Sequence, residues 1–323
     1  MRLHRIIDSN MEQVQKTKYD LAFFASGYEQ RCTYVARLLN KDAVKQPVVL
    51  GFQEYERARQ RIENDRYFER CWVGDQISIS SDDEGPIYDV LRKMTASTEH
   101  TLRLFVDYSS MSRLWYAGIL NWARYASNFD EIIIDFLYAV GSHRKSIPPL
   151  MISDILTVPG CEGVPMQLSK SVAVFGLGFD SLATLCMLDR LEPDIIYAFL
   201  AFPAAFTDYP LRARRSNREI VKKHAKATLE LPLKSVEQTF SHLAELVAPY
   251  REEADVTLVP MGPKPHVLAS ILVSMRFEDI VCLRVSGKRE RPERVEATGD
   301  VVVTTVQFKA ETLLSDAQKC IEK

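Results

Sequence analysis

Short apolar runs recur along the chain, and an amphipathic stretch follows most of them. The runs that resemble buried strands cover residues 21–24, 48–52, 102–108, 172–175, 195–202 and 256–261. Because these runs are apolar with little alternation, they indicate strands that are buried on both faces, as in a parallel sheet. Strands that alternate with helices predict βαβ units with right-handed crossovers. The pattern therefore predicts an α/β fold with mainly parallel sheets.

The runs fall into two sets that match in order and spacing, which indicates an internal duplication. In one set the segment FASGYE (24–29) ends the first strand, and in the other set FGLGFD (175–180) does so. The strands at 102–108 and 256–261 also correspond, since each leads into a turn and a helical segment. The sequence thus predicts two duplicated, Rossmann-like, three-layer halves related by a pseudo-two-fold axis.

The segment between the two sets of strands is rich in proline and glycine and shows little periodicity, which is typical of a linker. We therefore assign residues 1–145 to an N-terminal Rossmann-like half, 146–170 to a linker and 171–323 to a C-terminal Rossmann-like half. On this assignment, residues 301–308 add a strand to the C-terminal half. The residues after 309 add a helix.

Composition and charge narrow the class of protein further. Hydrophobic residues make up 46% and charged residues 26% of the 323 residues, which is typical of a globular protein. The formal net charge of −2 gives no general attraction to nucleic acid or to a membrane surface. The six cysteines are scattered, so we expect reduced thiols in a cytoplasmic protein and no metal site. No apolar run has the length of a membrane span, so no membrane partner is expected.

A ligand of a doubly wound sheet binds beyond the carboxyl ends of the strands, where the turns into the helices lie. Glycine lets the backbone approach a ligand closely, and hydroxyl and backbone N–H groups at a helix start suit a phosphate. By these criteria the expected ligand-binding residues are Ser26, Gly27, Arg31, Ser109, Ser110, Arg113, Gly176, Gly178, Ser181, Gly262 and Lys264. The candidates for general acid–base catalysis in the same turns are Glu29, Asp107, Asp180 and His266.

These residues also have purely structural explanations. Gly27 and Gly178 can serve tight turns alone, and Asp107 can simply cap the helix that follows it. An isolated histidine such as His266 is more often structural than catalytic. The basic segment 211–226 can hold phosphates, but a solvated helix face is an alternative explanation. A binding site is favoured because polar residues occupy the same two turns in both halves, where this fold concentrates function.

Two turns resemble a motif of a nucleotide-binding family. GPKPHVLA (262–269), with DYSSMSR (107–113) as its divergent counterpart, resembles the turn after a later strand in CRISPR-associated Rossmann-fold (CARF) sensors. The related fused sensors of cyclic-nucleotide defence systems share this element. The resemblance implies a nucleotide or cyclic oligonucleotide in the cleft between two pseudo-symmetric halves, and a role in prokaryotic antiviral defence.

A second resemblance is more local. FGLGFDSLATL (175–185) is similar to the first turn of the PP-loop ATP pyrophosphatases, and Gly178, Asp180 and Ser181 fit that pattern. The resemblance implies a turn that cradles phosphate groups.

Together these features predict a protein that binds or senses a nucleotide, with the ligand in the cleft between the halves. No cofactor other than a nucleotide is expected. Two alternatives stay open: an enzyme that acts on a nucleotide or phosphoester, and a degenerate Rossmann-like scaffold that joins a protein partner or a second copy of itself. Exposed apolar surface on the aromatic helix 114–126 would suit the scaffold, although a helix that is aromatic on several faces is more often buried in the core.

Overall fold

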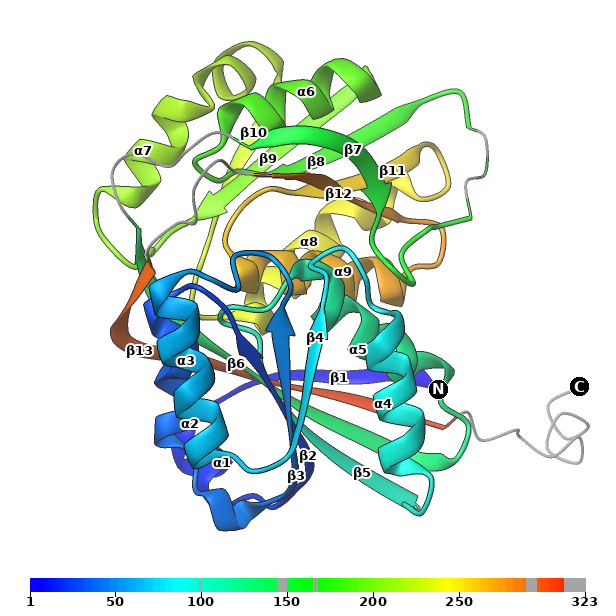
Figure 1. Cartoon of the computed structure of the whole chain (residues 1–323). Helices are drawn as coiled ribbons and strands as arrows, with labels where there is room; N and C mark the ends of the chain where they lie inside the picture. The colour runs from blue at the N-terminus through cyan, green and yellow to red at the C-terminus, as the bar shows by residue number, and fades with distance from the viewer. Residues whose placement is uncertain (99, 144–149, 165, 167, 289–294, 311–323) are drawn as a thin grey trace, which may run out of the picture.

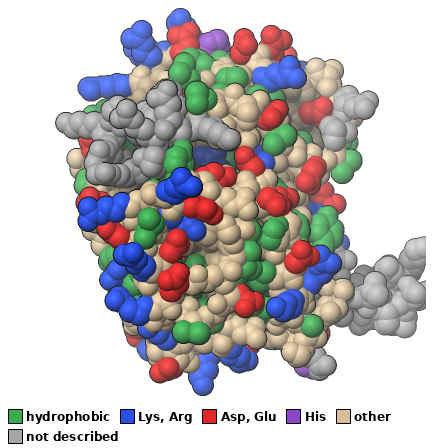
Figure 2. All heavy atoms as spheres, viewed as in Figure 1, with side chains coloured by type: hydrophobic (Ala, Val, Ile, Leu, Met, Phe, Trp, Pro, Cys, Tyr) green, Lys and Arg blue, Asp and Glu red, His purple; other side chains and the backbone are tan. Residues whose placement is uncertain are grey.

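The structure is a computed structural model that describes residues 1–98, 100–143, 150–164, 166, 168–288 and 295–310. Its strands form a seven-stranded and a six-stranded sheet, each flanked by helices (Figure 1). Within these described ranges, no helix is long and apolar enough to cross a membrane. Acidic and basic side chains are interspersed over the face in Figure 2, as the small net charge leads us to expect. The predicted C-terminal helix lies outside the described residues.

The first half is a doubly wound α/β unit. Its elements are β2 (Tyr19–Ser26), α2 (Tyr34–Leu38), β3 (Val44–Phe52), α3 (Arg59–Cys71), β4 (Asp75–Ile79), α4 (Gly85–Thr95), β5 (His100–Asp107), α5 (Arg113–Tyr125) and β6 (Phe129–His143). The parallel strands lie in the order β4-β3-β2-β5-β6. The chain winds from β2 to one side and then from β5 to the other, which creates the switch point where such folds bind ligands.

The second half repeats this winding. Its elements are β8 (Ser171–Gly176), α6 (Ser181–Leu191), β9 (Ile195–Ala201), α7 (Tyr209–Ser216), the π-helix Ile220–His224, β10 (Ala227–Leu231), α8 (Val236–Val247), β11 (Asp255–Pro260), α9 (Lys264–Arg276) and β12 (Val281–Lys288). Its parallel strands lie in the order β10-β9-β8-β11-β12, which is the order of the first half. The predicted duplicated α/β fold with mainly parallel sheets is therefore confirmed.

The edge of the first sheet is built from both ends of the chain. β13 (Val295–Lys309) pairs antiparallel with β6, and β1 (Arg2–Ser9) pairs antiparallel with β13. A short helix, α1 (Met11–Lys16), then leads into β2. The tail strand thus belongs to the first sheet and not to the C-terminal half, to which we assigned it. The sequence of β13 could not reveal this, because the place of β13 in the fold depends on the edge of β6, which would otherwise lack a partner strand.

The predicted linker also contributes to a sheet. β7 (Met151–Thr157) pairs antiparallel with β12 and forms an edge of the second sheet. Ile152 and Ile155 on this strand pack against the apolar cluster of that sheet. Residues 146–149, 165 and 167 of the predicted linker lie outside the described residues.

One hydrophobic core joins the two halves. α5 and α9 contact each other at the seam between the halves, and the largest apolar cluster includes Trp115 of α5 and Leu268 of α9. Trp115 and most of the apolar side chains around it on α5 are fully buried, and Tyr125 at the end of the helix is exposed. This helix is therefore a core helix, which was the alternative to the exposed apolar surface that a scaffold would use.

A carboxylate of the first sheet caps a helix of the second half. Asp8 Oδ1 accepts the backbone N–H of Val236 at 3.1 Å and that of Glu237 at 3.2 Å, at the N-terminus of α8. The Ser235 hydroxyl donates to Oδ2 of the same carboxylate. A carboxylate in this position satisfies N–H groups that have no partner in the helix and favours the positive end of the helix dipole.

We predict that Asp8→Ala lowers the free energy of unfolding by about 1–2 kcal/mol, because the N–H groups of Val236 and Glu237 lose their acceptor, while the N-cap Ser235 still accepts the N–H of Gln238. Urea denaturation followed by circular dichroism measures the change. The control is the same substitution at the exposed Asp42, which should cost less than about 0.5 kcal/mol. Equal losses in the two variants would contradict the capping role.

Candidate functional site

The turns that follow the central strands of the two sheets meet at the seam between the halves. Arg113 is the first residue of α5, and Lys264 is the first residue of α9, so the two hold corresponding positions in the two halves. Arg113 Nη1 donates to the carbonyl oxygen of Pro260, at the end of β11, at 3.0 Å. Lys264 reaches in the opposite direction, to the turn after β5. Each half thus extends the first side chain of a helix into the other half.

Lys264 ties its half to three backbone carbonyl groups. Its Nζ donates to the oxygens of Tyr108 at 3.1 Å, Ser109 at 2.8 Å and Met111 at 2.6 Å. An ammonium group has three N–H donors, and these contacts use all of them. Burial lowers the pKa of Lys264 to about 7, although the nearby Glu29 carboxylate opposes the shift. Lys264 therefore serves first as a link between the halves.

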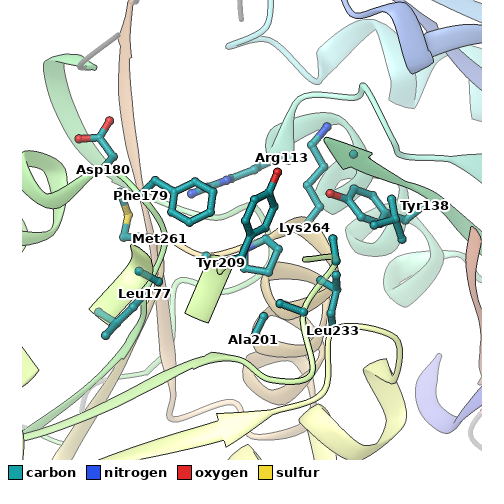
Figure 3. Close-up of a pocket in the computed structure, with 18 of the residues that line it drawn as sticks. Arg113, Tyr138, Leu177, Phe179, Asp180, Ala201, Tyr209, Leu233, Met261 and Lys264 are labelled. Atoms are coloured by element: carbon teal, nitrogen blue, oxygen red, sulfur yellow. The ribbon is translucent and has the colours of Figure 1, made fainter. Parts of the chain in front are cut away.

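A pocket of about 260 Å³ lies beside this crossing, and both halves line it (Figure 3). The first half contributes mainly polar side chains, which are Glu29, Arg31, Arg113 and Tyr138. The second half contributes the turn after β8, two aromatic rings, a group of small side chains and the turn into α9, which are Leu177, Gly178, Phe179, Asp180, Ala201, Ala204, Ala205, Tyr209, Ala213, Leu233, Met261, Gly262, Pro263 and Lys264. Lys264 reaches toward the first half, so the charged side chains gather mainly there, and the side chains of the second half are otherwise mainly apolar, apart from Asp180.

Arg31 and Glu29 form a buried ion pair at the charged end. Arg31 is 3% exposed; its Nε donates to Glu29 Oε2 at 2.7 Å and its Nη1 to the carbonyl of Ala139 at 2.9 Å. The guanidinium also lies over the ring of Tyr138, 5.0 Å from its centroid. The Ser110 hydroxyl donates to the same Glu29 oxygen at 3.0 Å. Both charges are thus held in place by several contacts before any ligand binds.

Asp107 lies behind this end of the pocket. Its Oδ1 accepts the backbone N–H of Ser109 at 3.1 Å and the Ser109 hydroxyl at 2.5 Å. Its Oδ2 is buried without a hydrogen-bond partner among the described residues. Burial raises the pKa of Asp107 to about 6, although the Ser109 donors oppose the shift. Asp107 shapes the turn after β5 and does not line the pocket.

The turn after β8 is shaped by close backbone contact and by a helix cap. A Cβ added to Gly178 would lie 2.3 Å from the carbonyl oxygen of Met261, so only glycine fits there. Asp180 Oδ1 accepts the N–H of Ala183 in the first turn of α6 at 3.3 Å, and Oδ2 accepts the N–H of Leu150 at 3.2 Å. Asp180 therefore caps a helix and also lines the pocket.

His266 lies in the core and not at the pocket. Its ring is 1% exposed and lies 5.5 Å from the ring of Phe199, and its Nε2 is 3.3 Å from the carbonyl oxygen of Pro232. Burial lowers the pKa of His266 to about 4, so the ring is neutral at pH 7. This is the environment of a structural histidine, and His266 does not line the pocket.

The predicted site residues therefore divide into two groups. Those that line the pocket are Glu29, Arg31, Arg113, Gly178, Asp180, Gly262 and Lys264. Those that do not line it are Ser26, Gly27, Asp107, Ser109, Ser110, Gly176, Ser181 and His266. Most of the second group support the turns from behind; Ser26, for example, donates to Asp65 Oδ1 at 2.5 Å. The four acid–base candidates do not converge on one point.

Two asparagines that the sequence reasoning missed hold the first turn of each half. Asn64 Nδ2 donates to the carbonyl of Gly27 at 2.8 Å, and Asn217 Nδ2 donates to that of Gly178 at 2.8 Å. Both asparagines are 3% exposed. The signal in the sequence is a shared spacing, because each ends an Arg-x-x-Asn segment, RIEN (61–64) and RRSN (214–217). The matched hydrogen bonds are a further trace of the duplication.

The basic segment 211–226 is partly neutralised within the protein. Arg214 pairs with Glu230 at 2.7 Å, and Lys223 pairs with Glu219 at 2.9 Å. Arg212 lies over the ring of Phe179, 4.0 Å from its centroid. These contacts make the segment a wall of the pocket on one side and a solvated, ion-paired surface on the other.

Comparisons with known proteins do not indicate a function, so the function is inferred from the site. No protein-family model matches the chain, and no curated protein matches it. A solved structure to which the chain is similar is the cytoplasmic domain of a prokaryotic cation chloride cotransporter. The sequence identity is 10% and the TM-score 0.24, over 85% of this chain and 97% of that chain. At this level of similarity we draw no conclusion from it about fold or function.

The two buried titratable groups His266 and Asp107 make opposite contributions to stability. Between pH 4 and 6.5 the unfolded chain protonates His266 while the folded chain does not. The free energy of unfolding therefore falls as the pH falls through this range. Between pH 3.8 and 6 the folded chain protonates Asp107 while the unfolded chain does not. The stability that Asp107 contributes is therefore lost as the pH rises through this range. Each shift corresponds to about 3 kcal/mol, and in the native protein the two partly cancel.

We therefore predict opposite pH profiles for His266→Gln and Asp107→Asn. Relative to the native protein, His266→Gln should gain stability as the pH falls from 6.5 to 4. Asp107→Asn should gain relative stability as the pH rises from 4 to 6. Urea denaturation across this range measures both profiles, with Asp42→Asn as the exposed control. If the three variants keep constant differences from the native protein at every pH, the two environments are not as described.

Proposed function

We propose that the protein binds a nucleotide in the pocket between its two halves. The observation that carries this proposal is the position and polarity of the pocket. It lies at the carboxyl ends of both sheets, where doubly wound folds bind nucleotides, and it joins a charged end to an apolar one. A nucleotide has the same division, with an anionic phosphate and a planar base.

The charged end is suited to an anion. Arg31 and Arg113 line the pocket beside Lys264, and these three basic side chains outnumber the acidic Glu29 and Asp180. Electrostatic attraction is stronger at a buried site than in bulk water. Arginine is also the side chain whose planar guanidinium best matches the oxygens of a phosphate. A phosphate at this end would therefore be attracted without rearrangement of the fold.

The apolar end is suited to a planar ring. The rings of Phe179 and Tyr209 lie 5.2 Å apart at 84°, and both appear at the centre of the pocket in Figure 3. The alanines at 201, 204 and 205 leave the space in front of these rings open. Aromatic side chains stack on bases of any kind, which supports binding of a nucleotide without fixing which base it carries.

Catalysis on the nucleotide has less support. Of the acid–base candidates, Glu29 and Asp180 alone line the pocket. Glu29 accepts from Arg31 and Ser110, and Asp180 accepts from backbone N–H groups, so both carboxylates already act as hydrogen-bond acceptors within the fold. The resemblance to CARF sensors instead supports nucleotide sensing in prokaryotic antiviral defence as the role of the binding site.

The test is calorimetric titration of the full chain with nucleoside mono-, di- and triphosphates. We expect at least one of them to bind with a Kd below about 100 μM. Ala205→Trp should weaken that binding by at least about tenfold, because the indole fills the pocket while cutting no hydrogen bond.

The matched control is Ala227→Trp, which places the same side chain at an exposed position on β10, and it should keep the native affinity. Thermal unfolding of both variants checks that the fold is retained. The proposal is overturned when no nucleotide binds the native protein, or when the Ala205→Trp protein binds as well as the control.

A further inference from the structure

We infer that the pocket takes one ligand of mononucleotide size, with its ring on the second half and its anionic group at the seam, and not a symmetric cyclic oligonucleotide. This inference rests on the proposed function and names the ligand class more closely. It follows from a difference between the two halves at positions that the duplication makes equivalent.

The pairing of the central strands gives the correspondence. Phe24 on β2 pairs with Val49 on β3, and Phe175 on β8 pairs with Ala198 on β9. Phe24 and Phe175 begin the matching turn segments of the two halves. Val49 and Ala198 are therefore equivalent, and residues at equal distances after them are equivalent up to the strand ends. Beyond the strands the spacing differs, since the matched Asn64 and Asn217 follow at unequal distances, so residues there are compared by their distance from the strand end.

Counting forward from this pair aligns Phe52 with Ala201 and Tyr55 with Ala204. Each strand ends at the first member of its pair, since β3 ends at Phe52 and β9 ends at Ala201. The first half thus has two large aromatic side chains where the second half has two alanines. Ala201 and Ala204 both line the pocket.

The aromatic side chains fill the corresponding space in the first half. The ring of Phe52 lies 4.1 Å from that of Trp115, and Phe52 is 7% exposed. The ring of Tyr55 meets that of Tyr28 at 5.0 Å, and Phe52 lies 6.2 Å from Tyr28. None of the residues from 32 to 112 lines the pocket. One half is therefore closed by its own side chains, and the other is open because its side chains are small.

This asymmetry constrains the ligand. A cyclic oligonucleotide presents equivalent nucleotides around its ring, so it needs equivalent space in both halves. The pocket of about 260 Å³ is slightly below the range of roughly 300–1,000 Å³ typical of small-molecule sites, which suits a single nucleotide unit. The first half contributes Arg31 and Arg113 to the anion-binding end and contributes no space for a ring.

The apolar end is rigid enough to select a ring. Arg212 covers Phe179 at 4.0 Å, and the edge-to-face contact with Tyr209 at 5.2 Å fixes the angle between the two rings. A base that enters from the seam therefore meets a preformed surface of Tyr209 and the alanines. Preorganised contacts of this kind favour one orientation of the ligand, with the phosphate left at the arginines.

The experiment exchanges the side-chain sizes of the two halves. Ala204→Tyr gives the second half the residue of the first, and Tyr55→Ala makes the opposite change. The full-length native protein and both variants are titrated calorimetrically with AMP, GMP, CMP and UMP, and with cyclic di-AMP, cyclic di-GMP and cyclic tetra-adenylate. Thermal unfolding of each variant confirms that it is folded.

We expect one mononucleotide bound per chain, and cyclic ligands weaker by at least about tenfold. Ala204→Tyr should weaken mononucleotide binding by at least about tenfold, and Tyr55→Ala should change it by less than about twofold. The inference fails, while nucleotide binding stands, when a cyclic oligonucleotide binds more tightly than every mononucleotide, when two ligands bind per chain, or when the variants have equal effects. Absence of binding by every ligand overturns the proposed function itself and this inference with it.

Discussion

The antiparallel pairing of β13 with β6 is the constraint on which the rest of the structure depends. It brings the chain back into the first sheet after the whole second half has formed, so the second half is attached to the first sheet at both of its ends. β6 would otherwise expose an unpaired edge with apolar side chains on both faces. With both connections fixed, α5 and α9 meet at the seam, and the turns at the carboxyl ends of the two sheets come within hydrogen-bond distance of each other.

Polar contacts then determine how the halves face each other at this seam. Apolar packing between α5 and α9 is not directional, whereas the crossing of Arg113 to Pro260 and of Lys264 to the turn after β5 requires one arrangement. Burying such charges costs free energy that only complete hydrogen bonding offsets, as the three carbonyl partners of Lys264 illustrate. The seam therefore holds fixed positive charge at little benefit to stability, which is the expected property of a site that binds an anion.

The sequence was informative where a residue's role depends on its own strand or turn. Apolar runs located the parallel strands, and the turn residues Arg31, Arg113 and Gly178 were placed at the pocket. It was uninformative where a role depends on a partner far along the chain. The place of β13 depends on the edge of β6, and the position of His266 depends on how α9 packs against Phe199. Asn64 and Asn217 were missed for the same reason, since their function lies in carbonyl groups of distant turns.

Duplication explains why the pocket is formed by two halves that no longer match. In two identical halves, a large side chain that fills the space beside one turn also fills it in the other half. A small side chain leaves that space empty in both halves. Here the equivalents of Phe52 and Tyr55 are alanines, so the second half has an opening that the first half lacks. The first half does not bind the ring of the ligand. Its turn keeps the buried ion pair of Arg31 and Glu29, and its Phe52 packs on Trp115. Charge and cavity are thus supplied by different copies of one unit, and a ligand with distinct anionic and planar ends is the kind of molecule that can use both.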